Sequence, residues 1–333
     1  METLIYAFNA VTPLLILISL GYILRRVLRL SDNFFPQLNS FCYRILLPIQ
    51  LFYNVYKIEK FSTVNWGAII YAIAWIPIAI VLGILMSKLF IKDHRQKGAF
   101  VQATFRSNQA IMGLPLAKEL GGDAAMPVAS LATSLGIPIF NVSAVAILKI
   151  YNNASGKKTS LAEIVKGIIT NPLIIGVFSG MICVAIRYLI PEMDGSPMFT
   201  IENNLPPVFS VIKTLSGVAS PVMLICLGAS LKFSFTKSLL FRIFAGVLMR
   251  LVIIPGAAIA IAVLHRNQLG LTPAEYPMLV AFLGSPVAVS SAILVKETGG
   301  DEVYAGQLVI WSSVFSMISL FTIIAILKNF GYL

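Results

Sequence analysis

The sequence predicts an all-α polytopic membrane protein with ten transmembrane helices, and two observations support this fold class. Of the 333 residues, 58% are hydrophobic and only 12% are charged, whereas roughly a quarter of the residues in an average soluble domain are charged. In addition, apolar runs long enough for the ~20 residues that a bilayer requires recur along nearly the whole chain. Together these features exclude a soluble protein.

Each predicted span is an apolar run between turn signals. The first five spans cover 3–24, 34–57, 66–91, 98–118 and 124–148, and the second five cover 167–190, 205–231, 238–264, 274–295 and 302–327. No basic residue precedes the first span and no small-residue cleavage site follows it, so we expect a retained helix rather than a signal peptide. The three cysteines lie within spans and predict apolar packing, not disulfides: Cys42, Cys183 and Cys226.

The basic residues predict the orientation, because cytoplasmic loops carry an excess of Lys and Arg. Of the 25 Lys and Arg residues, fifteen fall in one set of alternate loops and six on the opposite side, termini included. Both termini are therefore expected on the non-cytoplasmic side of the cell (inner) membrane. The net charge of +11 forms no patch with interleaved aromatic residues, so no nucleic-acid partner is expected. Four basic residues lie within spans: Arg44, Arg106, Lys213 and Arg250.

An internal repeat divides the chain into two five-span units. RSNQAIMGLPLAKELGGD (106–123) matches GSPVAVSSAILVKETGGD (284–301) at eight of eighteen positions. An odd number of crossings inverts the second unit in the membrane, which is a common architecture of secondary transporters. We predict a first repeat at 1–151, a short cytoplasmic linker at 152–166 and a second repeat at 167–333. The shared KE-x-GGD sequence is expected to be a tight interhelical loop without substrate contact.

Corresponding helix breaks are predicted in spans four and nine. Gly and Pro interrupt a helix, and in hydrocarbon such an interruption survives only where protein or a wet cavity surrounds it. The later half-helix presents a partial positive charge and free N–H groups at its N-terminal end. Two such ends meeting at mid-depth form an anion site. The residues predicted to form the breaks are Gly113, Pro115, Gly284 and Pro286.

Polar side chains gather beside these predicted breaks and are the candidate substrate ligands: Asn108, Gln109, Ser285, Ser290 and Ser291. The structural alternative is that each proline only kinks its span and that the hydroxyls bond back to their own helix. Arg106 either extends to the cytoplasmic surface or serves the anion. Arg250, near the centre of span eight, is a functional candidate by default, because a charge inside the membrane is costly.

The acidic residues argue against several other mechanisms. All fourteen fall at span ends or in loops, whereas a proton relay or a carboxylate-based sodium site places Asp or Glu inside a span. The sequence contains no protease metal motif, paired intramembrane aspartates or phosphate-binding glycine loop. No enzymatic activity, metal or cofactor is therefore expected.

Five stretches resemble the auxin efflux carrier family, and the similarity runs along essentially the full chain. They are LGYILRRVLRLSD (20–32), the Asn108-x-x-x-Met-Gly-x-Pro115 pattern, NPLIIGVFSG (171–180), ASPVMLICLGASL (219–231) and SPVAVSSAILVKETGGD (285–301). The resemblance implies two inverted five-helix repeats, a homodimer, a scaffold of spans one, two, six and seven, and an elevator-type transport domain of the other six.

The resemblance also implies a substrate and its ligands. It places the binding-site asparagine on Asn108 and the crossover proline on Pro115, whereas Ser291 stands where plant members have a second crossover proline. Plant members carry anionic auxin, and bacterial relatives are associated with malate, malonate and similar carboxylates. The predicted function is outward transport of a small organic anion, a carboxylate. The alternatives are a sodium-coupled organic anion symporter of the bile-acid-carrier type and a non-transporting ligand sensor.

Overall fold

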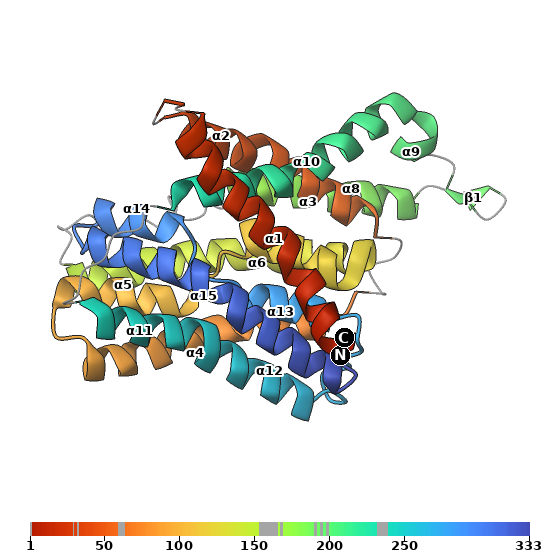
Figure 1. The fold of residues 1–333 in the computed structure, drawn as a ribbon. Coiled ribbons are helices and arrows are strands. Elements are labelled where there is room, and N and C mark those ends of the chain that lie inside the picture. The colour runs from red at the N-terminus through yellow and green to blue at the C-terminus, as the bar shows by residue number, and fades with distance from the viewer. Residues whose placement is uncertain are drawn as a thin grey trace.

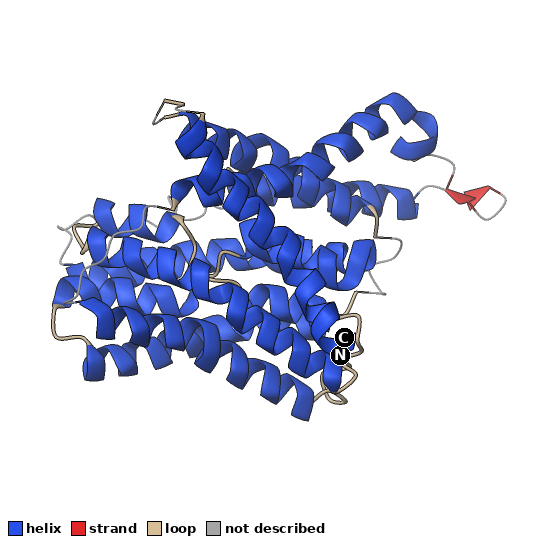
Figure 2. Ribbon diagram, viewed as in Figure 1, coloured by secondary structure: helices blue, strands red, loops and turns tan. Residues whose placement is uncertain are grey.

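The computed structural model describes residues 2–28, 30–31, 33–58, 64–152, 166, 169–189, 192–193, 196–197, 200–231 and 239–333. The predicted linker at 152–166 lies outside these residues except for its two ends. The described chain is almost entirely helical, with one pair of two-residue strands, β1 (Glu192–Met193) and β2 (Ser196–Pro197), projecting from it (Figure 2).

The first half of the chain forms helices close to the predicted spans. They are α1 (Glu2–Val27), α2 (Phe34–Phe41), the π-helical turn η1 (Cys42–Leu46), α3 (Leu47–Tyr56), α4 (Trp66–Phe90), α5 (His94–Phe105), the π-helical turn η3 (Gln109–Gly113) and α6 (Leu114–Asn152). Within α6 the backbone of Gly122 has a φ of 59°, which separates two helices at a kink. The KE-x-GGD sequence therefore does form a tight turn here, because glycine tolerates positive φ.

The second half contains α8 (Pro172–Leu189), α9 (Ile201–Asn204), α10 (Pro206–Ser230), α11 (Leu240–Leu248), the π-helical turn η5 (Met249–Ile253), α12 (Ile254–Leu264), α13 (Tyr276–Gly284), α14 (Ser290–Glu297) and α15 (Glu302–Asn329). The second KE-x-GGD copy is again a turn. Gly299 has a φ of 76°, and the Asp301 carboxylate accepts a hydrogen bond from the Tyr304 N–H at 2.9 Å to cap α15.

Six described helical segments are long and apolar enough to cross a membrane. They are Glu2–Val27, Trp66–Phe90, Gln109–Tyr151, Pro206–Ser230, Leu240–Leu264 and Glu302–Asn329. Many large apolar side chains on these helices face outward, as a lipid-facing surface requires; Ile70 is 64% exposed and Phe244 is 62% exposed. The chain is therefore a polytopic membrane protein.

The helices form two groups (Figure 1). One group contains α2, α3, α8 and α10, and α1 crosses from it toward the other. The other contains α4, α5, α6 and α11 to α15. The two termini lie together, since the Lys328 ammonium stands 4.3 Å from the ring centre of Tyr6.

Glycines allow very close approach within the first group. A side chain at Gly21 of α1 would clash with the backbone carbonyl of Ile225, and one at Gly228 of α10 would clash with that of Ile18. The two helices therefore exchange glycine-to-backbone contacts at one crossing. Between α3 and α8, Gly176 similarly packs on the Pro48 carbonyl. Small residues at such crossings are typical of helix pairs in membranes.

Candidate functional site

Two non-helical segments cross at the centre of the second helix group. The first, 106–108, separates α5 from η3, and the second, 285–289, separates α13 from α14. Ser107 and Val287 pair as an antiparallel bridge. The Asn108 N–H donates to the Pro286 carbonyl at 2.8 Å, and the Ala288 N–H donates to the Arg106 carbonyl at 3.0 Å. Where each helix is interrupted, its backbone groups lose their intrahelical hydrogen bonds. The crossing segment supplies hydrogen bonds to them instead.

The first interruption lies earlier than the sequence analysis placed it. Gly113 ends the π-helical turn η3, and Pro115 is the second residue of α6; neither lies in the non-helical segment. Pro115 follows η3 without a gap, so the helical stretch runs on from Gln109, and the wider π-helical turn before the proline accommodates its missing N–H. Our prediction of a break at Gly113 and Pro115 is therefore wrong. In the second segment, Gly284 ends α13 and Pro286 lies within the interruption.

Several side chains at the crossing are buried with a polar atom that has no protein partner. Asn108 is 4% exposed, Gln109 2% and Ser291 3%. The Asn108 Nδ2, Gln109 Oε1 and Ser291 Oγ atoms lack hydrogen-bond partners among the described residues. The Gln109 Nε2 atom donates to the Thr133 carbonyl at 3.2 Å. Because an unpaired buried polar atom costs about 1–3 kcal/mol, these three atoms are held at the crossing at a cost in free energy.

The other predicted serines differ in environment. The Ser285 hydroxyl donates to the Ala281 carbonyl of its own helix at 2.6 Å, which is the back-bonding alternative considered above. The Ser290 side chain is exposed. Ser107 was not predicted as a site residue; its hydroxyl donates to the Phe282 carbonyl at 2.9 Å and links the two broken segments.

Arg106 is buried and held by neutral groups. Its Nη2 atom donates to the Asn141 Oδ1 atom of α6 at 2.9 Å. In the amide orientation that satisfies both neighbours, the Gln102 oxygen accepts from Arg106 Nη1 at 2.9 Å and its nitrogen donates to the Ser291 carbonyl at 3.3 Å. Arg106 is only 8% exposed, so it does not extend to the surface. This guanidinium has no carboxylate partner among the described residues.

Arg250 is also buried, at 2% exposure, and it contacts the second broken segment and the C-terminal end of α5. Its Nε and Nη2 atoms donate to the Ser285 carbonyl at 2.8 and 2.6 Å. Its Nη1 atom lies 3.3 Å from the Thr104 carbonyl and 3.4 Å from the Phe105 carbonyl. The predicted substrate ligand is thus directed at backbone oxygens.

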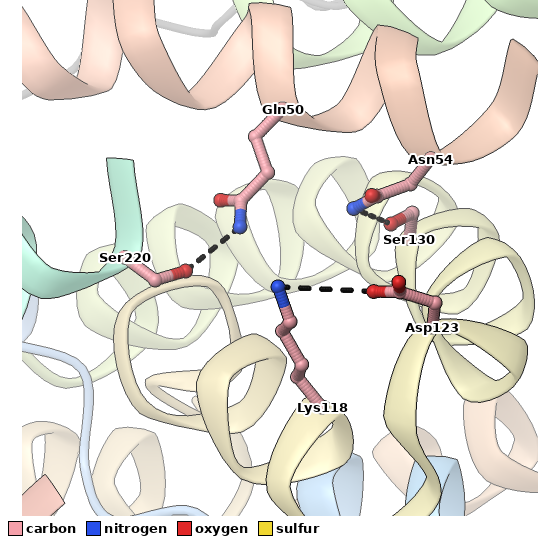
Figure 3. Close-up of polar contacts among 6 residues, drawn as sticks. All are labelled: Gln50, Asn54, Lys118, Asp123, Ser130 and Ser220. Atoms are coloured by element: carbon pink, nitrogen blue, oxygen red, sulfur yellow. Dashed lines mark hydrogen bonds and ion pairs between the residues drawn. The ribbon is translucent and has the colours of Figure 1, made fainter. Parts of the chain in front are cut away.

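A polar cavity of about 340 Å³ lies between the two helix groups. Its polar wall comes from α3 and α10 on one side and α6 on the other, and its residues include Gln50, Asn54, Lys118, Glu119, Asp123, Lys213, Ser216 and Ser220. The Gln50 Nε2 atom donates to Ser220 Oγ at 2.8 Å, and the Asn54 Nδ2 atom donates to Ser130 Oγ at 3.0 Å (Figure 3). The Gln50 Oε1 atom is buried without a partner among the described residues.

Charged groups of the first KE-x-GGD copy line this cavity (Figure 3). The Lys118 Nζ and Asp123 Oδ1 atoms lie 3.7 Å apart, with both side chains largely exposed. Pro115 lines the same cavity, so the turn that follows Asn108 leads to it. Sequence reasoning missed Gln50 and Asn54, although two amides in the apolar stretch LLPIQLFYN (46–54) are a signal that can reveal them.

Crossed, interrupted helices beside a polar cavity in a polytopic membrane protein are typical of secondary transporters. The comparison with known families agrees: residues 6–324 match the model of a family described as membrane transport protein. This is the auxin efflux carrier family, and the chain belongs to it. The resemblance inferred from the five sequence stretches is thereby confirmed. No curated protein matches the chain. The chain is therefore a membrane transporter by family.

Proposed function

We propose that this protein is a secondary carrier that exports a small organic anion, a carboxylate, by an elevator-type alternating-access mechanism. The observation that carries the proposal is the unpaired Asn108 Nδ2 donor at the crossing of the two broken segments. An amide N–H is a suitable donor to a carboxylate oxygen. It stands at the N-terminal end of the π-helical turn that begins at Gln109, where the helix dipole also favours an anion.

The buried charge at the crossing favours an anionic rather than a cationic substrate. The described residues contain no group of three or more His, Cys, Asp or Glu side chains that could hold a metal ion. The two lysines of the cavity, Lys118 and Lys213, are matched by Glu119 and Asp123, so the unbalanced positive charge near the crossing is that of Arg106, which has no carboxylate partner among the described residues. The ligand set we propose is Asn108, Gln109 and Ser291, with Arg106 supplying positive charge nearby. Ser285 and Ser290 are not retained as side-chain ligands, because one bonds back to its helix and the other is exposed.

The two helix groups support separate roles for a scaffold and a mobile transport domain. We propose ten spans in two inverted repeats, with α1, α2, η1, α3, α8 and α10 as the scaffold and the helices around the crossing as the mobile domain. The glycine contacts at Gly21, Gly176 and Gly228 would make the scaffold rigid. By contrast, the interface between the groups contains a polar cavity and single hydrogen bonds such as Asn54–Ser130, which can break and re-form during sliding. We further propose a homodimer in the cell membrane with both termini outside the cytoplasm.

The membrane potential is the proposed driving force, since moving one charge across 100 mV yields about 2.3 kcal/mol. The test is counterflow of labelled carboxylates in proteoliposomes that contain the full chain. Uptake that exceeds that of empty liposomes, with efflux that slows when the potential is collapsed, is the expected result. Ligand-induced thermal stabilisation without counterflow would identify a sensor instead. Efflux that is indifferent to the potential would refute the energetic part of the proposal.

A further inference from the structure

Arg250 lies where the C-terminal ends of two half-helices converge. The helix α5 ends at Phe105 and α13 ends at Gly284. The Arg250 guanidinium reaches the Ser285 carbonyl after one helix and the Thr104 and Phe105 carbonyls at the end of the other. One side chain from a third helix thus joins the last carbonyl groups of both half-helices.

Electrostatics explains why a cation belongs at this point. The last four carbonyls of a helix have no intrahelical partner, and a helix C-terminus carries about −0.5 of an elementary charge. Two such ends together therefore balance roughly one positive charge. The guanidinium is planar, remains protonated and presents five N–H donors. Its burial without a carboxylate is tolerated because these carbonyls replace water around it.

The local backbone helps to place this side chain. Arg250 lies in the π-helical turn η5 (Met249–Ile253), and Pro255 follows at the start of α12. Proline lacks the N–H that would bond the preceding turn, so the helix widens there. π-Helical turns re-aim side chains and are frequent at functional sites. The π-helical turn η5 therefore contains the residue whose side chain reaches the crossing.

In carriers with discontinuous helices, unwound carbonyls and half-helix C-termini commonly coordinate a transported sodium ion. Here the corresponding oxygens accept hydrogen bonds from Arg250. We propose that Arg250 is a resident cation that organises the crossing in place of a coupling sodium ion. It is a positioning residue: it joins the C-terminal ends of the two half-helices α5 and α13, and the substrate binds to other groups. This inference rests on the proposed carrier function, and it separates this chain from a sodium-coupled symporter.

The experiment compares the purified full-length protein with Arg250→Ala and Arg250→Lys in thermal melts. Each melt is recorded in choline chloride, in sodium chloride and with guanidinium far below denaturing concentrations. The wild-type midpoint should be the same in choline and sodium. The midpoint of Arg250→Ala should be lower and should rise with guanidinium concentration in a saturable manner, because the free ion occupies the vacated space. Arg250→Lys keeps the charge and should lie between the two.

The matched control is Arg95→Ala. Arg95 also donates to two backbone carbonyls, those of Gly299 and Gly300 at 3.2 and 3.3 Å, but its side chain is exposed. Water can replace it, so its variant should show no saturable response to guanidinium. A general solvent effect of guanidinium would appear equally in this control.

A second measurement reports the crossing itself. Ser107→Cys and Val287→Cys are introduced together after replacement of the three native cysteines. They should form a disulfide in the protein that retains Arg250. Arg250→Ala should slow that cross-link and guanidinium should restore it, an effect that general destabilisation would not produce. If Arg250→Ala fails to fold, the melting midpoints and cross-linking rates of Arg250→Lys and Arg250→Gln are compared. The difference between these two variants tests whether the positive charge is required.

Three outcomes would overturn the inference: sodium-specific stabilisation of the wild type, an Arg250→Ala variant that cross-links normally without guanidinium, or equal behaviour of the Lys and Gln variants. These readouts need no substrate. A failed counterflow assay would therefore reject the proposed function while leaving the role of Arg250 to be decided by its own test.

Discussion

At the residue scale, the unpaired buried atoms carry most of the functional information. The protein buries Asn108 at 4% exposure without a partner for its Nδ2 atom, although such burial costs free energy. Arg250 is buried more deeply, but its hydrogen bonds among the described residues are to backbone oxygens. The two residues were both predicted as ligands from the sequence. Their surroundings separate a buried donor without a hydrogen-bond partner among the described residues from a donor that already bonds backbone oxygens.

Asn108→Ala should weaken substrate binding strongly and fold stability only slightly. Losing a hydrogen bond to a charged ligand costs about 1.5–3 kcal/mol, or roughly 10- to 150-fold in affinity. In the ligand-free protein the Asn108 Nδ2 atom has no hydrogen-bond partner among the described residues. Its removal therefore leaves no protein acceptor unpaired. A transport assay paired with a thermal melt measures both effects. Unchanged transport would remove Asn108 from the site, and loss of transport with a collapsed melt would make the residue structural.

At the element scale, the crossing of the two broken segments determines the geometry of the site. Ser107 and Val287 are paired, and the hydrogen bonds lie on either side of them. This is the pattern of a non-hydrogen-bonded antiparallel pair, whose Cα atoms lie about 4.5 Å apart with their side chains close together. The distance falls within the range that a disulfide can bridge.

Ser107→Cys with Val287→Cys should therefore cross-link under mild oxidation when the three native cysteines have been replaced. Mobility on a denaturing gel after protease cleavage between the two positions measures the bond. Ser107→Cys combined with Ser290→Cys is the control that should yield no bond between the two repeats, because the Ser290 side chain is exposed and lies outside the Ser107–Val287 bridge. A failure of the first pair to cross-link in folded protein would contradict the crossing.

The glycine crossing of α1 and α10 makes a stability prediction. Gly228→Ala should destabilise the protein by about 1–3 kcal/mol or more, because overpacking a tight contact forces the backbones apart and the added methyl would meet the Ile18 carbonyl. Gly217→Ala on the same helix is the control, since nothing lies within 4 Å of its added Cβ. Thermal melts of the two variants measure the difference. Equal midpoints would argue against the close contact.

At the scale of the whole molecule, the two helix groups differ in how they are joined. Contacts within the α1, α3, α8 and α10 group include glycine-to-backbone packing. Between the groups lie a cavity of about 340 Å³ and side-chain hydrogen bonds such as Asn54–Ser130. A closely packed group beside an interface that contains a cavity is compatible with sliding of one body against the other.

Asn54→Cys with Ser130→Cys should lock the carrier. The side chains that now share a hydrogen bond belong to α3 and α6, so a disulfide between them would prevent relative movement of the groups. Counterflow should fall to background on oxidation and return on reduction. Each single cysteine variant is the control for loss of the hydrogen bond alone. Full counterflow in the oxidised double variant would rule out sliding at this interface.

The sequence alone determined the fold class and the positions of most helices. Hydrophobicity and turn residues act over short distances along the chain, so the limits of α4 and α10 were predicted within one or two residues. The second interruption was likewise predicted at Pro286, where no N–H is available for a helix. The first was misplaced at Pro115, because a helix can continue through a proline when a π-helical turn precedes it. Family membership also followed from local motifs, and the family match confirmed it.

Only the tertiary structure decided which polar groups meet. Arg250 bonds carbonyls 35 and 146 positions away in sequence, and Asn54 bonds a serine 76 positions away. No periodicity in the sequence encodes these pairs, because they depend on how helices cross and which face each presents. Burial then separates the roles: the same cationic side chain is a candidate ligand if it faces a cavity and a structural cation if it faces backbone oxygens. That distinction depends on packing, and it emerges only when the two broken helices are brought together in space.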